Sequence, residues 1–401
     1  MNIVNKIWNF FRNKVEQNLL TVPYRLLPIE KVILFESVPD LSDNSKAVFD
    51  EMVRLGVNKE YQLIWLIRGD INRVSISIDN VKFVSAKGET FRERMRVARL
   101  EYTSACLISC NYFLSTRRKG QVSFYLTHGS PIKSVKKYYT FPNNIDYCMV
   151  ASENMVDVMS YEMNADKSKL VALGYPRNDA FYGPDVDLNT MLKRQYAKVI
   201  VWYPTYRQHA AGGSKLTQNA LPIIHDQEKA NALNEFACQN NVMIVVKPHF
   251  AQNLSYITDL GLSNIVFIDD SFFGNNEISS YQFVKSCDAL ITDYSSIYYD
   301  YTLCDKPIGL IWEDYDEYKN NVGFAVDMNE YMKGAEKIYS LEDFKRFISD
   351  LASERDRKKF DRNEIKSIVN FLDDGKNSER VTRFVLDKLG QECDGHDYSK
   401  A

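Results

Sequence analysis

The sequence predicts an α/β protein made of two units, each with a mostly parallel β-sheet. After Pro28, short β-rich apolar runs alternate with helical segments. This alternation is typical of a parallel sheet that helices cover on both faces. A second series of the same kind begins near residue 198. The segment from Gly174 to Asp187 joins the two units, and we expect a cleft between them.

The first series spans residues 29–180, which we assign to an N-terminal Rossmann-like domain. Apolar, β-rich composition predicts its strands, and apolar residues at helical spacing predict its helices. The expected strands are 31–36, 61–67, 81–84, 105–109, 124–127 and 147–151, and the expected helices are 44–55 and a basic helix at 91–102.

The second series spans residues 181–390, which we assign to a C-terminal Rossmann-like domain, followed by a tail at 391–401. The same criteria apply to it. The expected strands are 198–203, 242–247, 265–268, 289–292 and 308–311; helices are expected at 227–240 and 295–303, and charged helical segments between 341 and 389.

Residues 2–20 have the pattern of one amphipathic helix. Ile3, Ile7, Phe10, Phe11, Val15 and Leu19 recur at helical spacing, with Trp8 beside them and Lys6, Arg12 and Lys14 on the polar side. A basic, aromatic helix of this kind suits a membrane interface. The same pattern also occurs in helices that pack on their own domain, and the spacing alone does not separate these two interpretations.

Bulk properties exclude several classes of protein. The formal net charge of −3 argues against a nucleic-acid partner, because proteins held by phosphate contacts are normally basic. The seven cysteines are scattered without a Cys-x-x-Cys, which favours a reducing cytoplasm over a disulfide framework. No apolar stretch of about 18 residues is present to span a bilayer. The N-terminus also lacks the apolar core and cleavage site of a signal peptide.

A first polar cluster, Thr-His-Gly-Ser-Pro-Ile-Lys at 127–133, follows an expected strand. Ligands of open α/β sheets bind at the carboxyl ends of strands. Gly129 lets the backbone approach a ligand, and Ser130 follows it in the same turn. A histidine side chain ordinarily titrates near neutral pH, so His128 suits removal of a proton from an attacking hydroxyl. The alternative is a turn histidine with a local hydrogen bond.

Two further clusters also follow strands. Tyr-Pro-Thr-Tyr-Arg at 203–207 ends in Arg207, which suits a forked contact to phosphate, and its alternative is a surface arginine. Lys-Pro-His at 247–249 places Lys247 and His249 at the tip of an apolar strand. Together these two side chains could hold a diphosphate, whereas either residue alone is more often structural.

The fourth cluster is Thr-Asp-Tyr-Ser-Ser at 292–296. The strand is expected to end at Asp293, and Ser295 or Ser296 to cap the following helix. Free N–H groups and partial positive charge at a helix start suit a phosphate. The alternative is simple capping, in which the hydroxyls serve only their own helix.

Together these clusters resemble the CDP-glycerol glycerophosphotransferase family of teichoic-acid primases and polymerases. The segment 128–133 resembles its His-Gly-Thr-Pro-Leu-Lys element, and 292–296 matches its Thr-Asp-Tyr-Ser-Ser signature. Similar elements stand at 35–37 (Phe-Glu-Ser), 174–179 (Gly-Tyr-Pro-Arg-Asn-Asp), 203–207, 247–249 and 375–380 (Gly-Lys-Asn-Ser-Glu-Arg). They run in family order over nearly the whole chain, which makes the ordered set specific although each element alone is weak.

The resemblance implies a GT-B-like fold with the acceptor side in the N-terminal domain and the nucleotide side in the C-terminal domain. It implies a CDP-glycerol or CDP-ribitol donor, a lipid-linked acceptor, and a peripheral position on the cytoplasmic face of the cell membrane. On this basis we assign residues 1–28 to a membrane-associating segment. We expect no tightly bound cofactor and no metal held by the protein, since no carboxylate cluster is evident. A Mg²⁺ that arrives with the diphosphate remains compatible with this arrangement.

The mechanism we expect is alditol phosphate transfer to an acceptor hydroxyl, with CMP as the leaving group. His128 is the expected general base. Asp293 is expected to fix the turn that carries Ser295 and Ser296. We assign His128 and His249 as catalytic residues and, as donor-binding residues, Gly129, Ser130, Arg207, Lys247, Asp293, Ser295 and Ser296. Two alternatives are a GT-B glycosyltransferase that uses a nucleotide sugar and a non-catalytic scaffold for polymer export. The sequence leaves three questions open: whether the alditol is glycerol or ribitol, whether one unit is added or many, and whether the product is teichoic acid or a capsule.

Overall fold

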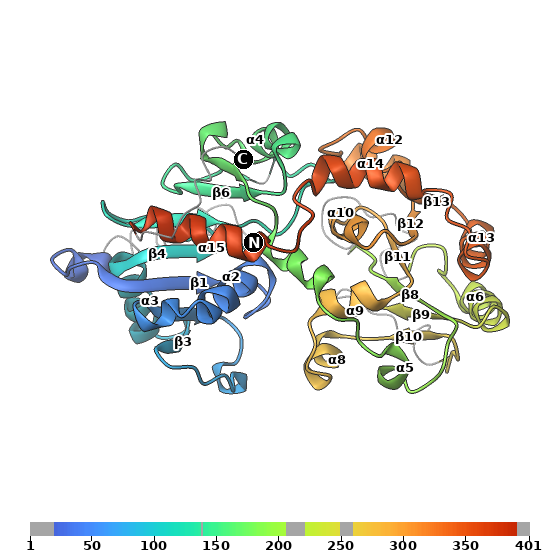
Figure 1. Cartoon of the computed structure of the whole chain (residues 1–401), viewed down its shortest axis with the longest axis horizontal. Coiled ribbons are helices and arrows are strands. Elements are labelled where there is room, and N and C mark those ends of the chain that lie inside the picture. Colours follow the sequence, from blue (N-terminus) through green and yellow to red (C-terminus); the bar gives the residue numbers. More distant parts are fainter. Residues whose placement is uncertain (1–19, 138, 206–220, 249–259, 391–401) are drawn as a thin grey trace, which may run out of the picture.

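The computed structural model describes residues 20–137, 139–205, 221–248 and 260–390, and these form two α/β domains side by side (Figure 1). Each domain is built on one sheet, and every strand pair in both sheets is parallel. The predicted α/β architecture of two parallel-sheet units is therefore confirmed. The helix predicted at residues 2–20 lies outside the described residues except for Leu20.

Among the described residues, the first sheet has seven strands in the order β3-β2-β1-β4-β5-β6-β7. The strands are β1 (Glu30–Glu36), β2 (Gln62–Ile67), β3 (Val81–Ser85), β4 (Ser104–Ser109), β5 (Val122–Tyr125), β6 (Tyr147–Val150) and β7 (Leu170–Ala172). The apolar runs in the centre of the sheet are buried on both faces, as expected where helices cover both sides.

Helices on the two faces of the first sheet close separate cores. One face, with Phe35 and Trp65, packs against α2 (Asp43–Arg54). The other face, with Leu34 and Leu66, packs against α3 (Phe91–Thr103), and farther along the sheet it meets α4 (Val156–Met163). Successive residues of one strand point to opposite faces, so β1 and β2 supply both cores.

The second sheet has six strands within the described ranges, in the order β10-β9-β8-β11-β12-β13. These are β8 (Lys198–Trp202), β9 (Val242–Val246), β10 (Ile265–Phe267), β11 (Ala289–Thr292), β12 (Ile308–Ile311) and β13 (Glu336–Ile338). The helices around it are α5 (Leu188–Met191), α6 (Gln227–Gln239), α8 (Asp270–Asn275), α9 (Ser280–Ser286), α10 (Ile297–Tyr301), α11 (Tyr315–Asn321), α12 (Met328–Tyr331), α13 (Leu341–Ala352) and α14 (Lys359–Val369).

The chain crosses between the domains twice. It first crosses through the short 3-10 helix η6 (Pro176–Tyr182), and it returns before α15 (Asn377–Lys388), which packs against α2 on the first domain (Figure 1). α15 thus belongs spatially to the first domain, although its sequence lies within the range 181–390 that we assigned to the second. The reason is its apolar stripe of Val381, Val385 and Leu386, which completes the first core.

No helix in the described part of the chain is long and apolar enough to cross a bilayer.

Replacing Val385 with alanine tests the return of α15 to the first core. Val385 is fully buried, so Val385→Ala should lower the free energy of unfolding by roughly 2 kcal/mol through lost burial and a residual cavity. Val22→Ala removes the same atoms from a side chain that is 48% exposed, and it should change stability little. Urea denaturation measures the free energy of unfolding of each variant, and equal losses in Val385→Ala and Val22→Ala would contradict the packing of α15.

Candidate functional site

Three adjacent strands of the second sheet end at one edge, and two of the predicted donor-binding residues, Lys247 and Asp293, lie there. β8 lies between β9 and β11. Lys247 follows β9, Thr205 follows β8 and Asp293 follows β11. Because parallel strands share one carboxyl edge, these residues meet where α/β proteins bind ligands. Lys247 forms an ion pair of 2.9 Å with Asp270, and its side chain is 22% exposed.

Asp293 organises the turn after β11. Its buried carboxylate accepts hydrogen bonds from the backbone N–H of Thr205, at 2.9 Å, and from that of Tyr294, at 2.6 Å. The Thr205 hydroxyl also donates to it. Asp293 therefore ties together the loops that follow β8 and β11, and its oxygen atoms are engaged in holding the turn.

Ser295 and Ser296 stand between this turn and α10. Ser296 occupies the N-cap position, but its side chain makes no capping hydrogen bond. Both serines are half-buried. Simple capping by Ser296, one of the alternatives raised above, is therefore not what the structure shows.

In the first domain, His128 is held in a sharp turn after β5. Thr127 and Gly129, on either side of it, both have positive φ, of 55° and 128°. The side-chain amide of Asn44 on α2 donates to the carbonyls of Leu126 and Thr127, at 3.2 and 3.0 Å. The turn is thus anchored from the neighbouring helix and directs its backbone toward the second domain.

The two halves of the predicted site touch across the domain boundary at Gly129. A Cβ placed on Gly129 would clash with the Ser296 hydroxyl and lie 2.9 Å from a guanidinium nitrogen of Arg177. Ser130, the next residue, is buried and lies within hydrogen-bond distance of the Tyr175 hydroxyl, at 3.2 Å. The turn that carries His128 therefore lies directly against the serine turn of α10.

His128 lies in surroundings that favour its neutral form. Part of its surface is open to solvent, but protein atoms crowd its other sides, and this desolvation lowers its pKa below the ordinary value. The charge of Asp43 and the carbonyl of Cys110, 3.3 Å from Nδ1, oppose the decrease, while Arg177 and Lys133 add to it. A histidine with a lowered pKa is unprotonated at neutral pH and can accept a proton.

Arg177 is a buried cation that sequence reasoning did not assign to the site. Its guanidinium forms ion pairs of 2.7 Å with Asp43 at the start of α2 and with Asp300 on α10. Tyr281 and Asn178 donate further hydrogen bonds to Asp300, at 2.7 and 3.2 Å. Burial disfavours the charged form of Arg177, but the negative charges of Asp300 and Asp43 outweigh this effect and raise the pKa of Arg177 well above its ordinary value. Arg177 therefore joins both domains beside His128.

Lys133 is a second residue to which sequence reasoning gave no role. Its backbone forms an antiparallel bridge to Phe324 of the second domain, and Ser134 N donates to Gly323 O at 3.0 Å. Desolvation lowers the pKa of Lys133, and the charge of Asp293 opposes that shift. Its position at the end of the His-Gly-Ser-Pro-Ile-Lys element was the only signal available in the sequence.

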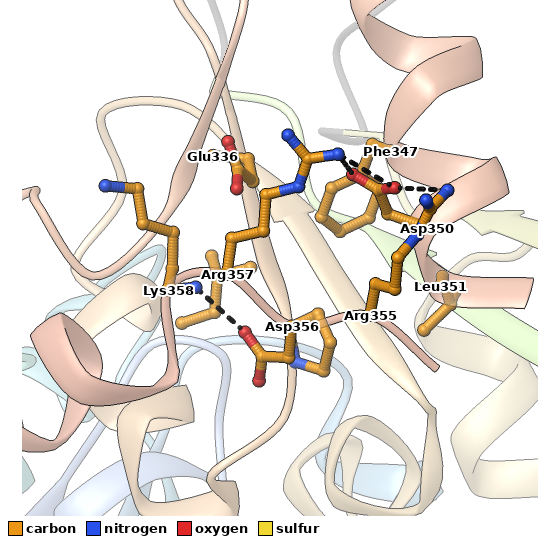
Figure 2. Close-up of a pocket in the computed structure, with 10 residues that line it drawn as sticks. Glu336, Phe347, Asp350, Leu351, Arg355, Asp356, Arg357 and Lys358 are labelled. Carbon is orange, nitrogen blue, oxygen red and sulfur yellow. Dashed lines mark hydrogen bonds and ion pairs between the residues drawn. The ribbon is translucent and has the colours of Figure 1, made fainter. Parts of the chain in front are cut away.

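Two of the predicted site residues, Arg207 and His249, lie outside the described residues. Within the described ranges no group of three or more His, Cys, Asp or Glu side chains could hold a metal ion. A charged pocket lined by Pro307, Glu336 and Asp350 lies at the amino ends of β12 and β13, the opposite edge of the second sheet (Figure 2).

Removing Arg177 should destabilise the protein strongly. Arg177→Ala leaves Asp43 and Asp300 without their buried cation, and breaking a buried pair in this way costs about 3–5 kcal/mol. The matched control is Arg73→Ala, whose ion pair with Asp70 is exposed and should contribute less than about 1 kcal/mol. Chemical denaturation gives the free energy of unfolding of both variants. A loss of stability in Arg177→Ala no larger than that in Arg73→Ala would refute the interdomain role.

Comparison with known proteins matches this chain to teichoic-acid enzymes. The teichoic acid glycerol-phosphate primase of Bacillus subtilis is 24% identical over 74% of this chain and 78% of its own length. The teichoic acid ribitol-phosphate polymerase TarL of Staphylococcus aureus is 23% identical over 87% of this chain and 60% of its own length.

Solved structures agree with the fold. The wall teichoic acid polymerase TagF superposes with a TM-score of 0.73 at 19% identity, covering 96% of each chain. A UDP-N-acetylglucosamine 2-epimerase from Listeria monocytogenes superposes with a TM-score of 0.56 at 14% identity, over 92% of this chain and 99% of its own. The predicted GT-B-like arrangement is confirmed. The model of the CDP-glycerol:poly(glycerophosphate) glycerophosphotransferase family matches residues 20–387, and the chain belongs to this family of enzymes.

Proposed function

We propose that this enzyme transfers glycerol phosphate or ribitol phosphate from a CDP-alditol to a hydroxyl of a lipid-linked acceptor in teichoic-acid or capsule synthesis. The observation that carries the proposal is the contact between Gly129 and Ser296. It brings the turn that carries His128 in the first domain against the serine turn of the second domain, and we propose that these domains bind the acceptor and the nucleotide respectively.

In the proposed reaction, His128 is the general base. The acceptor oxygen forms a bond to the β-phosphorus, the bond from that phosphorus to the bridging oxygen breaks, and CMP leaves. The proton of the acceptor hydroxyl passes to the imidazole. The neutral state of His128 supports this role, because a lowered pKa leaves the ring ready to accept a proton at neutral pH.

Positioning and charge stabilisation are the remaining tasks, as is general for phosphoryl transfer. Lys247 lies at the carboxyl edge of the second sheet, and we propose that it binds the diphosphate together with Arg207 and His249. The hydroxyls of Ser295 and Ser296 bind the phosphate on which charge develops. The side chain of Ser296 supports this assignment, since it does not cap its own helix.

A lipid-linked acceptor places the enzyme at the cytoplasmic membrane surface. We propose that the segment 1–28, with its basic and aromatic residues, contributes to this peripheral association.

The donor is identified by supplying CDP-glycerol and CDP-ribitol separately, with and without Mg²⁺, and measuring CMP release in the presence of a lipid-linked acceptor. Mass spectrometry of the product should show the mass of one or more alditol phosphates. A product that gains a sugar residue without phosphorus would instead identify a glycosyltransferase, and acceptor-independent lipid binding without CMP release would identify a scaffold.

Replacing His128 should separate chemistry from donor binding. His128→Ala should lower turnover by about 10²- to 10⁴-fold, the usual contribution of one general base, while calorimetry shows donor affinity largely kept. In the wild-type enzyme the acid limb of kcat/KM should fall below the ordinary histidine pKa of about 6.5, because loss of activity follows protonation of His128. Near wild-type turnover in the variant would disprove the assignment.

Adding a methyl group at the domain contact should impair turnover without removing any reactive group. In Gly129→Ala the methyl group meets Ser296 and Arg177, and a misplacement of about 1 Å can lower the rate about 10²-fold. Gly261→Ala is the matched control, because Gly261 also has positive φ but no atom lies within 4 Å of the place that its new methyl group would take. Equal rates in the two variants would show that the contact does not matter for transfer.

A further inference from the structure

The outer face of α3 is a basic surface that the proposed transfer reaction does not use. Arg92, Arg96 and Arg99 follow one another at helical spacings of four and three residues, so they lie on one side of the helix. All three are exposed. The whole chain has a net charge of −3, and the concentration of cations on this helix is therefore a local feature.

Two of these arginines have no ionic partner in the described part of the chain. Arg99 pairs with Glu30 at 2.7 Å, whereas neither Arg92 nor Arg96 forms an ion pair with another described residue. Exposed arginines with no internal partner remain available to an external anion.

Exposed apolar side chains accompany the arginines. Phe91, at the start of α3, is 61% exposed. The short 3-10 helix η1 (Val22–Tyr24) contacts α3, and Leu26, two residues after it, is 97% exposed. The carbonyl of Leu27 accepts a hydrogen bond from Arg118, whose guanidinium lies over the ring of Tyr102, so Leu26 lies toward the end of α3. Basic and apolar residues together suit an anionic lipid surface, which offers both phosphate and hydrocarbon.

A second group of cations provides the contrast. Arg355, Arg357 and Lys359 precede or begin α14, beside Phe360, which is 81% exposed. Here each cation has a carboxylate partner within the protein. Arg355 and Arg357 both pair with Asp350 (Figure 2), and Lys359 pairs with Asp305. Basic residues next to an exposed phenylalanine thus occur twice, but only the α3 face leaves two arginines without a described partner.

The direction of α3 relates this face to the candidate site. α3 follows β3 and ends directly before the parallel strand β4. Its first residue, Phe91, therefore lies at the carboxyl edge of the first sheet, the edge at which His128 follows β5. A surface lying along α3 would reach the same edge from which an acceptor must enter.

We propose that the outer face of α3, defined by Phe91, Arg92, Arg96, Arg99 and Leu26, binds the anionic lipid surface of the membrane. The face adds to the proposed contact of the segment 1–28 and orients the first domain, the proposed acceptor side, toward the bilayer. This inference rests on the proposed lipid-linked acceptor, but its test requires no turnover.

The experiment is cosedimentation of the full chain with vesicles of phosphatidylglycerol and phosphatidylcholine in equal amounts, and with vesicles of phosphatidylcholine alone. Arg92→Gln combined with Arg96→Gln should weaken binding to the anionic vesicles roughly thirtyfold, at about fivefold for each arginine. The matched control, Arg357→Gln with Lys359→Gln, removes two exposed cations and leaves Asp350 paired with Arg355 and Asp305 paired with Arg362. Its binding should equal that of the wild type.

Three results would overturn the proposal. The first is unchanged vesicle binding in the α3 variant, which would leave the segment 1–28 as the whole contact. The second is equal binding of the wild type to both vesicle types. The third is that the α3 variant loses binding to soluble poly(glycerol phosphate) but keeps its binding to vesicles, which would assign the face to the polymer. Thermal melting of each variant verifies folding, and CMP release with a soluble acceptor should be unchanged if transfer itself is correctly assigned.

Discussion

The position of the two domains depends on one buried interaction, the pairing of Arg177 with Asp43 and Asp300. Each carboxylate belongs to a different domain, and Arg177 lies on the segment that joins them. Such buried ions are expensive to desolvate, so they define a geometry more than they add stability. Here the surrounding donors Tyr281 and Asn178 complete the shell of Asp300. The network therefore has low energy in only one relative placement of the domains.

The domain contact contributes to the acid–base state of His128. Desolvation is the first cause of its lowered pKa; among the charges, Arg177 and Lys133 lower it further, whereas Asp43 raises it. Arg177 lies on the segment that joins the domains, and the backbone of Lys133 forms a bridge to Phe324 of the second domain. Two of the cations that favour the neutral imidazole are therefore held in place by the domain contact.

The sequence predicted the sheets well and the domain contact poorly, for physical reasons. Alternating apolar strands and helices are local patterns, and they led directly to two parallel sheets. The stripe Val381, Val385 and Leu386 shows that α15 has an apolar face, but periodicity cannot say which core will cover it. Arg177 lies 134 residues from Asp43 and 123 from Asp300, so no local pattern reveals the pairing. Lys133 was visible in its motif, whereas its proximity to Asp293 depends on domain closure.

The two chain crossings restrict how the domains can move apart. The carboxylate of Asp179, on the first crossing, accepts hydrogen bonds from the backbone N–H groups of Asn377 and Ser378, on the second, at 2.9 and 2.7 Å. Rotation about these tied crossings would keep them joined and would break the contacts farther out: Arg177 with Asp300, Gly129 with Ser296, and Lys133 with Phe324. Opening would therefore expose buried charge. In the proposed reaction, a donor diphosphate bound near Lys133 and Lys247 would supply negative charge at the same boundary, so donor binding and domain closure would favour each other.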